Sequence, residues 1–173
     1  ANNWYIGRKM KILINEILKT YGDNNINISK LNEHGFNEIH FWKFIKQHKD
    51  ENKKGIYVFI DGDKEYPKNI IYVGKAGESK KNEKGNNLGS RMKGYFFPKK
   101  KDNLLDDQDR IIFRKFNSSK INPNKVNPSS KNFNIITVST NNIDLVSPEL
   151  LESYLLNKIL KENKYYPLAN NEI

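Results

Sequence analysis

Hydrophobic and polar positions along the chain follow two kinds of pattern, which together predict a small mixed fold. Runs of β-branched and aromatic residues predict three strands, at 55–60, 69–74 and 133–140. Apolar residues at helical spacing predict helices at about 8–20, 37–48, 88–97, 103–115 and 147–161. The last helix has the clearest start, because serine is a favoured N-cap and proline suits the first helical position, and Ser147-Pro148 supplies both.

Polar segments between these elements divide the chain into a core and its additions. We expect one α/β (α+β) domain at 55–173, with a small, mainly antiparallel three-stranded sheet flanked by helices. Residues 1–54 are expected to form an N-terminal helical extension. Basic insertions are expected at about 77–88 and 98–132, and the second of these includes a long loop of the kind that is usually functional or disordered.

Composition narrows the class of partner. The 173 residues carry a formal net charge of +10, which favours a polyanionic partner such as nucleic acid. No cysteine is present, which excludes disulfides and the usual cysteine-containing zinc sites and fits a reducing cytoplasm. No apolar run approaches the ~20 residues of a membrane-spanning helix, so we expect a cytoplasmic protein without a membrane partner. Because of the positive net charge, the N-terminal extension at 1–54 is expected to contact DNA.

Two of the predicted strands carry one tyrosine each. Tyr57 lies on the first strand and Tyr72 on the second, with Lys75 three residues further on. Because an ordinary tyrosine has a pKa of about 10, it acts as a base at neutral pH only beside a cation that favours its phenolate. Tyr57 is the first candidate for such a base, and Lys75 is placed to be its cation. Tyr72 is the second candidate for the base. The structural alternative is a pair of tyrosines that only pack on the sheet.

The predicted helix that begins near 88 carries two further candidates. Arg91 and Tyr95 are four residues apart and therefore share one helix face. A guanidinium stays charged and can grip two phosphate oxygens at once, and a tyrosine hydroxyl can hydrogen-bond a third. A solvated arginine beside a packing tyrosine is the alternative interpretation.

The order of these residues resembles the signature of the GIY-YIG nuclease superfamily. The matching segments are Gly55-Ile56-Tyr57, Tyr72-Val73-Gly74-Lys75-Ala76, Leu88 to Phe96, Leu151-Glu152-Ser153-Tyr154-Leu155-Leu156, and Pro167-Leu168-Ala169-Asn170. The resemblance covers about 55–97 and 133–171. It implies an endonuclease that hydrolyses phosphodiester bonds in double-stranded DNA, with catalytic residues Tyr57, Tyr72, Lys75, Arg91, Tyr95 and Glu152.

Glu152 is the candidate metal ligand within that resemblance. A lone carboxylate can hold Mg²⁺ if waters and phosphate oxygens complete the coordination shell, so one Mg²⁺ is expected, for which Mn²⁺ can substitute. Glu149 is the competing ligand, although an early acidic residue also complements a helix N-terminus. Asn170 is expected to anchor either the helix of Glu152 or the tyrosines.

The chain holds one catalytic module and no obvious second DNA-binding domain, so it looks most like a compact type II restriction endonuclease of this superfamily. A repair or mobile-element nuclease is the alternative enzyme, and a non-catalytic DNA-binding module of the same fold is the alternative from another class. A double-strand break needs two cuts, which a homodimer on DNA or sequential nicking by a monomer would supply.

Overall fold

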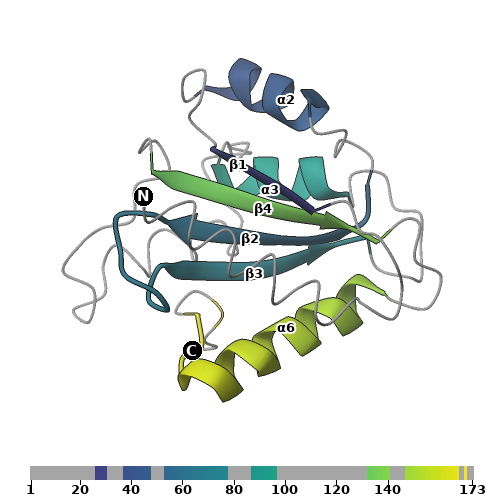
Figure 1. The fold of residues 1–173 in the computed structure, drawn as a ribbon. Coiled ribbons are helices and arrows are strands. Elements are labelled where there is room, and N and C mark those ends of the chain that lie inside the picture. Colours follow the sequence, from purple (N-terminus) through teal and green to yellow (C-terminus); the bar gives the residue numbers. More distant parts are fainter. Residues whose placement is uncertain are drawn as a thin grey trace, which may run out of the picture.

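A computed structural model describes residues 26–30, 37–47, 53–77, 87–96, 132–140, 147–167 and 170. Its elements are, in chain order, β1 (Ile26–Lys30), α2 (Glu38–Gln47), β2 (Gly55–Asp61), β3 (Ile70–Ala76), α3 (Leu88–Phe96), β4 (Phe133–Ser139) and α6 (Pro148–Asn163) (Figure 1). The helices predicted at 8–20 and 103–115 and most of both insertions lie outside the described residues.

The strands form one antiparallel sheet in the order β1-β4-β2-β3. The three predicted strands are present as β2, β3 and β4, so the general α+β class is confirmed. A fourth strand, β1, pairs with β4 from Ile26 opposite Val138 to Lys30 opposite Asn134. Part of the expected helical extension therefore belongs to the sheet, while α2 lies close to the helix predicted at 37–48.

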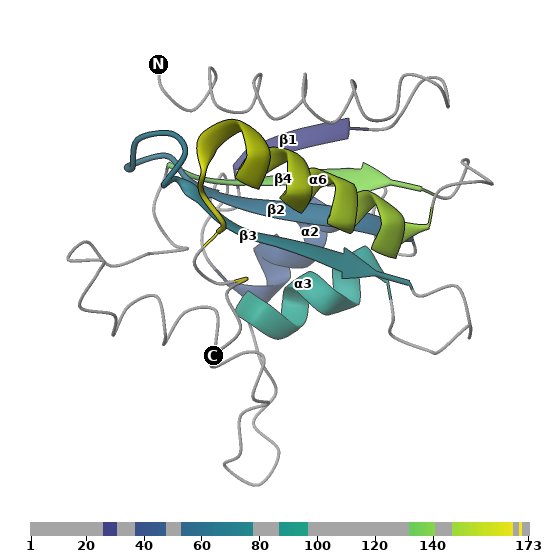
Figure 2. The ribbon, with the colours of Figure 1, turned by 90° about the horizontal axis from the view of Figure 1, so that it is seen from below.

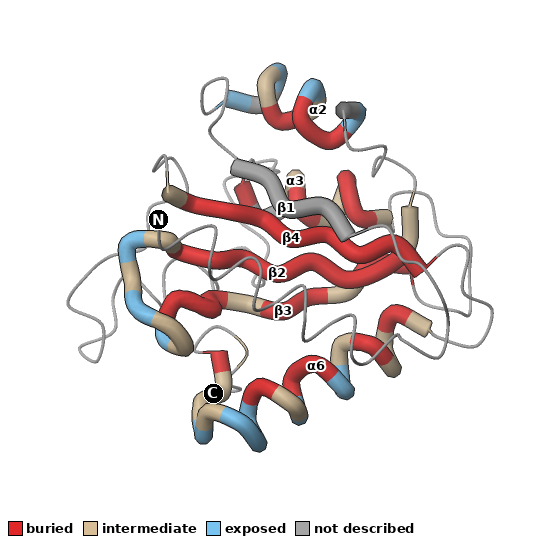
Figure 3. The backbone as a smooth tube through the Cα atoms, viewed as in Figure 1, coloured by how far each residue is buried: buried red, intermediate tan, exposed pale blue. Residues whose placement is uncertain are grey.

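Helices cover both faces of the sheet, with α6 on one face and α2 and α3 on the other (Figures 1 and 2). Successive residues of a strand point to opposite faces, and β2 shows this directly. Ile56 and Val58 pack with Leu151 of α6, whereas Tyr57 and Phe59 pack in the cluster formed with α2 and α3. Every residue of β2 is buried, which explains its continuous apolar sequence (Figure 3).

Helix α6 begins as its sequence predicts. Ser147 has extended backbone angles and its Oγ accepts a hydrogen bond from the Leu150 N–H at 3.2 Å, with Pro148 at the first turn. The helix ends at Lys164, which adopts the left-handed conformation with φ 55° and donates its backbone N–H to the Leu160 carbonyl at 2.8 Å. The helix thus extends slightly beyond the predicted end at 161.

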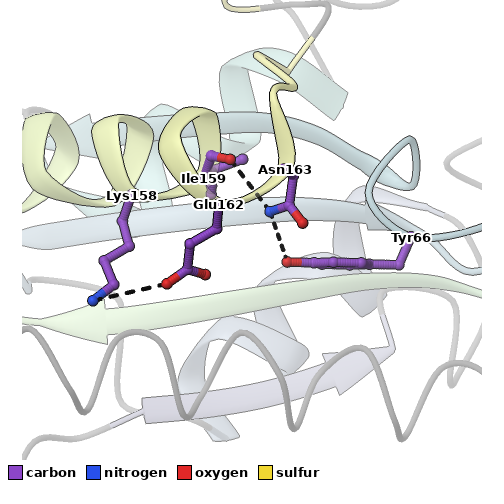
Figure 4. Close-up of polar contacts among 5 residues, drawn as sticks. All are labelled: Tyr66, Lys158, Ile159, Glu162 and Asn163. Atoms are coloured by element: carbon purple, nitrogen blue, oxygen red, sulfur yellow. Dashed lines mark hydrogen bonds and ion pairs between the residues drawn. The ribbon is translucent and has the colours of Figure 1, made fainter.

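The connection between β2 and β3 is anchored to the end of α6. This connection is longer than a two-residue hairpin loop, and the structure describes all of it, at 62–69. Tyr66 accepts a hydrogen bond from the Asn163 side chain at 3.0 Å, and the same amide nitrogen donates to the Ile159 carbonyl at 3.2 Å (Figure 4). Tyr165 donates its hydroxyl to the Ile70 carbonyl at 3.2 Å. The turn therefore serves to hold α6 against the sheet.

Candidate active site

The two glycines of the paired motif are required by close packing. A Cβ atom at Gly55 would lie 1.8 Å from the Val138 carbonyl oxygen, so β2 approaches β4 too closely there for any side chain. A Cβ atom at Gly74 would lie 2.4 Å from Cε2 and Cζ of Tyr57 and 2.5 Å from its hydroxyl. The far end of the Tyr57 ring therefore lies over Gly74, and the phenol extends from the inner strand β2 to the edge strand β3.

A Gly74→Ala substitution is expected to destabilise the fold by about 1–3 kcal/mol, because the added methyl displaces the Tyr57 ring from a packed core. Thermal unfolding measures this loss. The same methyl added at Gly94, inside α3, is the control and should be stabilising, since glycine in a helix costs about 1 kcal/mol relative to alanine. An unchanged midpoint for Gly74→Ala would contradict the packing argument.

The two motif tyrosines differ in exposure. Tyr57 is completely buried and its ring stacks on Phe59 with centroids 5.2 Å apart. Tyr72 is half-buried, and its ring centroid lies 6.1 Å from that of Tyr57. Both rings belong to the face covered by α2 and α3. Packing thus accounts for the burial of the Tyr57 ring. The hydroxyl of Tyr57 lies against Gly74 of β3, two residues along the strand from Tyr72.

Helix α3 is fixed beside this strand end by its first turn. Asn87 accepts the Ser90 N–H at 2.9 Å through its side chain, and the Leu88 N–H donates to the Lys53 carbonyl at 2.9 Å, just before β2. Arg91 follows one residue after Ser90 and is half-buried, with its Nε enclosed. Tyr95 lies in the same helix, and its side chain is outside what the structure describes.

Lys75 lies on the opposite face from the tyrosines. In the register of the hairpin, Tyr57 pairs with Gly74 and Ile56 pairs with Lys75. Because Ile56 packs toward α6, Lys75 leaves the sheet on the α6 side. The register therefore does not support the expected role of Lys75 as the cation that tunes Tyr57. Its neighbour is a carboxylate of α6.

That carboxylate is Glu152, half-buried in the second turn of α6. Burial raises the pKa of Glu152, the positive charge of Lys75 opposes this rise, and the negative charge of Glu149 adds to it. Lys75 and Glu149 are thus both close enough to act on Glu152 electrostatically. At the edge strand β3, Lys75 and Glu152 lie on one face of the sheet and the two tyrosines lie on the other.

Asn170 is bound directly to the edge strand. Its side-chain oxygen accepts the Val73 N–H at 2.8 Å and its side-chain nitrogen donates to the Val73 carbonyl at 2.8 Å. The amide thus takes both outward-facing backbone groups of Val73, as a neighbouring strand would. Val73 lies between Tyr72 and Gly74, so Asn170 holds the strand segment of the tyrosines rather than the helix of Glu152.

Replacing Asn170 with alanine is expected to destabilise the fold by about 2 kcal/mol, since two hydrogen bonds worth about 1 kcal/mol each are lost. The DNA cleavage that the resemblance implies should also fall per folded molecule, because the strand between Tyr72 and Lys75 loses its support. Asn163→Ala is the matched control: it also removes two side-chain hydrogen bonds, but at the other end of the sheet. Equal cleavage by the two variants, compared at equal folded fraction, would argue against a positioning role for Asn170.

Two carboxylates of α6 are the described residues that fit the implied metal. They contain no group of three or more histidine, cysteine, aspartate or glutamate side chains that could hold an ion. Glu149 and Glu152, one turn apart on α6, provide at most two carboxylates. Such a set fits Mg²⁺, which keeps several waters and is commonly held by one or two carboxylates together with substrate phosphates.

No protein-family model, curated protein or solved structure matches this chain. Within the described part of the chain, every helix is too short or too polar to cross a membrane.

Proposed function

We propose that the chain is a Mg²⁺-dependent endonuclease of the GIY-YIG type that hydrolyses phosphodiester bonds in double-stranded DNA. The observation that carries this proposal is the Lys75–Glu152 neighbourhood at the edge strand that also bears Tyr72 and lies under the Tyr57 ring. Packing of the strand alone does not call for a charged pair at the edge of the sheet. Phosphodiester hydrolysis uses a carboxylate, a cation and a hydroxyl, and the edge strand β3 has the first two on one face and the tyrosines on the other.

The ends of two helices support an anionic substrate at the same place. Helix α3 starts beside Lys53, immediately before the start of β2. Helix α6 starts one turn before Glu152, and Glu152 is close to Lys75 at the end of β3. Lys75 in turn pairs with Ile56 at the start of β2. Both N-termini therefore lie at the same end of the sheet, where their partial positive charges favour a phosphate.

Each side chain has a part in the proposed reaction. Arg91 grips two oxygens of the scissile phosphate, which orients it for attack. Tyr57, as its phenolate, takes the proton of the attacking water, and Arg91 of α3, the helix that packs on the tyrosine face, stabilises that phenolate in place of Lys75. Tyr72 hydrogen-bonds the water or the phosphate. Lys75 partly offsets the rise in the pKa of Glu152 that burial causes, and so favours the ionised carboxylate. Glu152, with Glu149 nearby, would hold Mg²⁺, which when bound stabilises negative charge on the phosphate oxygens.

Within this class we propose a type II restriction endonuclease, which acts as a homodimer or by sequential nicking. The purified protein is expected to convert supercoiled plasmid into discrete linear fragments with Mg²⁺ or Mn²⁺, and to leave it intact with EDTA. A smear of products would instead favour a repair or mobile-element nuclease. Binding of the plasmid without cleavage under any divalent metal would refute the catalytic proposal and leave a DNA-binding module.

A further inference from the structure

Helix α2 presents an exposed face that consists of one isoleucine followed by two lysines. Its inward side is formed by Phe41, Phe44 and Ile45, all buried. On the opposite side, Ile39 is 70% exposed and Lys43 and Lys46 are exposed. These three residues follow one another at spacings of four and three, so they form a single stripe along the helix. A lone exposed isoleucine is common, but this one continues a line of lysines.

The chain path places the lysine end of this stripe near the candidate active site. Strands β1 and β2 both run antiparallel to β4 and hence run in the same direction. Helix α2 connects the end of β1 to the start of β2, so it must return the chain to the Gly55 end of the sheet (Figure 1). That is the end where α3 and α6 begin.

Packing also fixes α2 relative to the helix that carries Arg91. The Phe41 ring of α2 lies 6.2 Å, centroid to centroid, from the Phe96 ring of α3. Phe96 in turn lies 5.0 Å from Phe59 of the sheet. The outward face of α2 is therefore presented by a rigid set of aromatic contacts, which is the support that a recognition surface requires.

We propose that this outward face of α2 reads duplex DNA in the major groove. Lys43 and Lys46 contact phosphates, and Ile39 contacts the methyl group of a thymine, which only the major groove exposes. The inference rests on the proposed function insofar as DNA is the substrate, and it adds the residues that recognise it. It assigns to α2 a role in sequence preference, separate from the hydrolytic residues around β3.

Duplex DNA fits this face better than other anionic surfaces. An α-helix enters the major groove of B-form DNA, whereas that of A-form RNA is too narrow for side chains to read. A membrane-surface helix needs a broad apolar face toward the lipid, but the apolar side of α2 is already buried against α3 and the sheet. One isoleucine next to two lysines suits a base-edge contact beside phosphate contacts.

Salt dependence of binding tests the lysines without any cleavage. In a Glu152→Gln background, a 30-base-pair duplex of random sequence is titrated with protein at several salt concentrations. Each of Lys43→Ala and Lys46→Ala is expected to reduce the slope of log affinity against log salt by about 0.9. The affinity lost between 50 and 200 mM salt would then shrink about 3.5-fold per lysine. Lys161→Ala, an exposed lysine in the last turn of α6, is the matched control and should leave the slope unchanged.

Selection from the same random pool tests Ile39. The Glu152→Gln protein should enrich a thymine at one position, and Ile39→Ala should lose that preference with an unchanged salt slope. Replacing that thymine with uracil, which lacks the methyl group, should weaken binding of the parent about tenfold and leave Ile39→Ala unaffected.

The outcomes separate this inference from the nuclease proposal. Altered slopes and a lost thymine preference support α2 as a DNA surface whether or not the wild-type protein cuts plasmid. Slopes for both lysine variants equal to that of Lys161→Ala, or no measurable duplex binding by the parent, would overturn it. A change in oligomeric state on Ile39→Ala, measured by sedimentation, with DNA binding unchanged would also overturn it, since the face would then serve a second copy of the chain.

Discussion

Replacing Glu152 with glutamine is expected to abolish DNA cleavage and at the same time to stabilise the folded protein at neutral pH. Cleavage should fall about 1,000-fold, or about 4 kcal/mol in activation free energy, because the proposed metal ligand is lost. The gain in stability follows from burial, which raises the pKa of Glu152 above its ordinary value of 4.5. An ionised carboxylate is therefore disfavoured in the folded state, and glutamine keeps the shape without the charge.

The pH dependence has a definite sign. With a folded-state pKa above that of the unfolded chain, the carboxyl contributes its full stability when it is protonated, below about pH 4.5. That contribution is lost as the pH rises through the folded-state pKa. The melting temperatures of wild type and Glu152→Gln, measured without metal, should therefore agree near pH 4 and diverge toward pH 7. Added Mg²⁺ should raise the wild-type value alone, since ligand binding stabilises the state that binds it.

Glu149→Gln is the matched control for this experiment. The variant removes a negative charge that raises the pKa of Glu152, so its own melting curve should depend less on pH. It is expected to retain more cleavage than Glu152→Gln and to keep the Mg²⁺ effect on stability. If instead Glu149→Gln loses the Mg²⁺ effect and Glu152→Gln keeps it, Glu149 is the metal ligand and the assignment made here is wrong.

The elements that could be predicted from sequence are those whose signals are local. Strand β2 is a continuous run of β-branched and aromatic residues, and Ser147-Pro148 marks the start of α6. Strand β1 carries no such signal, because five residues with two isoleucines also suit a loop. It becomes a strand through backbone pairing with β4, more than one hundred residues later, and a single sequence gives no register for such a partner.

The contacts at the candidate site also divide into those that have a local sequence signal and those that do not. The residue types are evident from the sequence, but the prediction that Lys75 tunes Tyr57 rests on its position three residues after Tyr72. The alternation of β3 sends Lys75 to the other face, toward Glu152. Strict alternation from Tyr72 to Lys75 already contained that information. The bond from Asn170 to Val73 did not have a local signal, since the two residues are 97 positions apart. Tyr95 and its role stay a prediction.

Arg91→Ala is expected to lower cleavage about 1,000-fold, while Arg91→Lys should recover no more than tenfold of that loss. Both variants remove the planar fork that grips two phosphate oxygens, and lysine restores only the charge. Because the grip matters most as charge develops on the phosphate, the loss should appear in the single-turnover rate rather than in DNA affinity. Duplex binding measured in the Glu152→Gln background should accordingly change only a few-fold.

Lys93→Ala provides the control for Arg91, since it removes another half-buried cation from the same helix. It should cleave DNA at close to the wild-type rate. Full cleavage by Arg91→Lys would show that charge alone suffices and that no two-point grip is made. Wild-type cleavage by Arg91→Ala would show that α3 is not part of the site. The residues of β3 and α6 would then have to hold and hydrolyse the phosphodiester without Arg91 binding the phosphate.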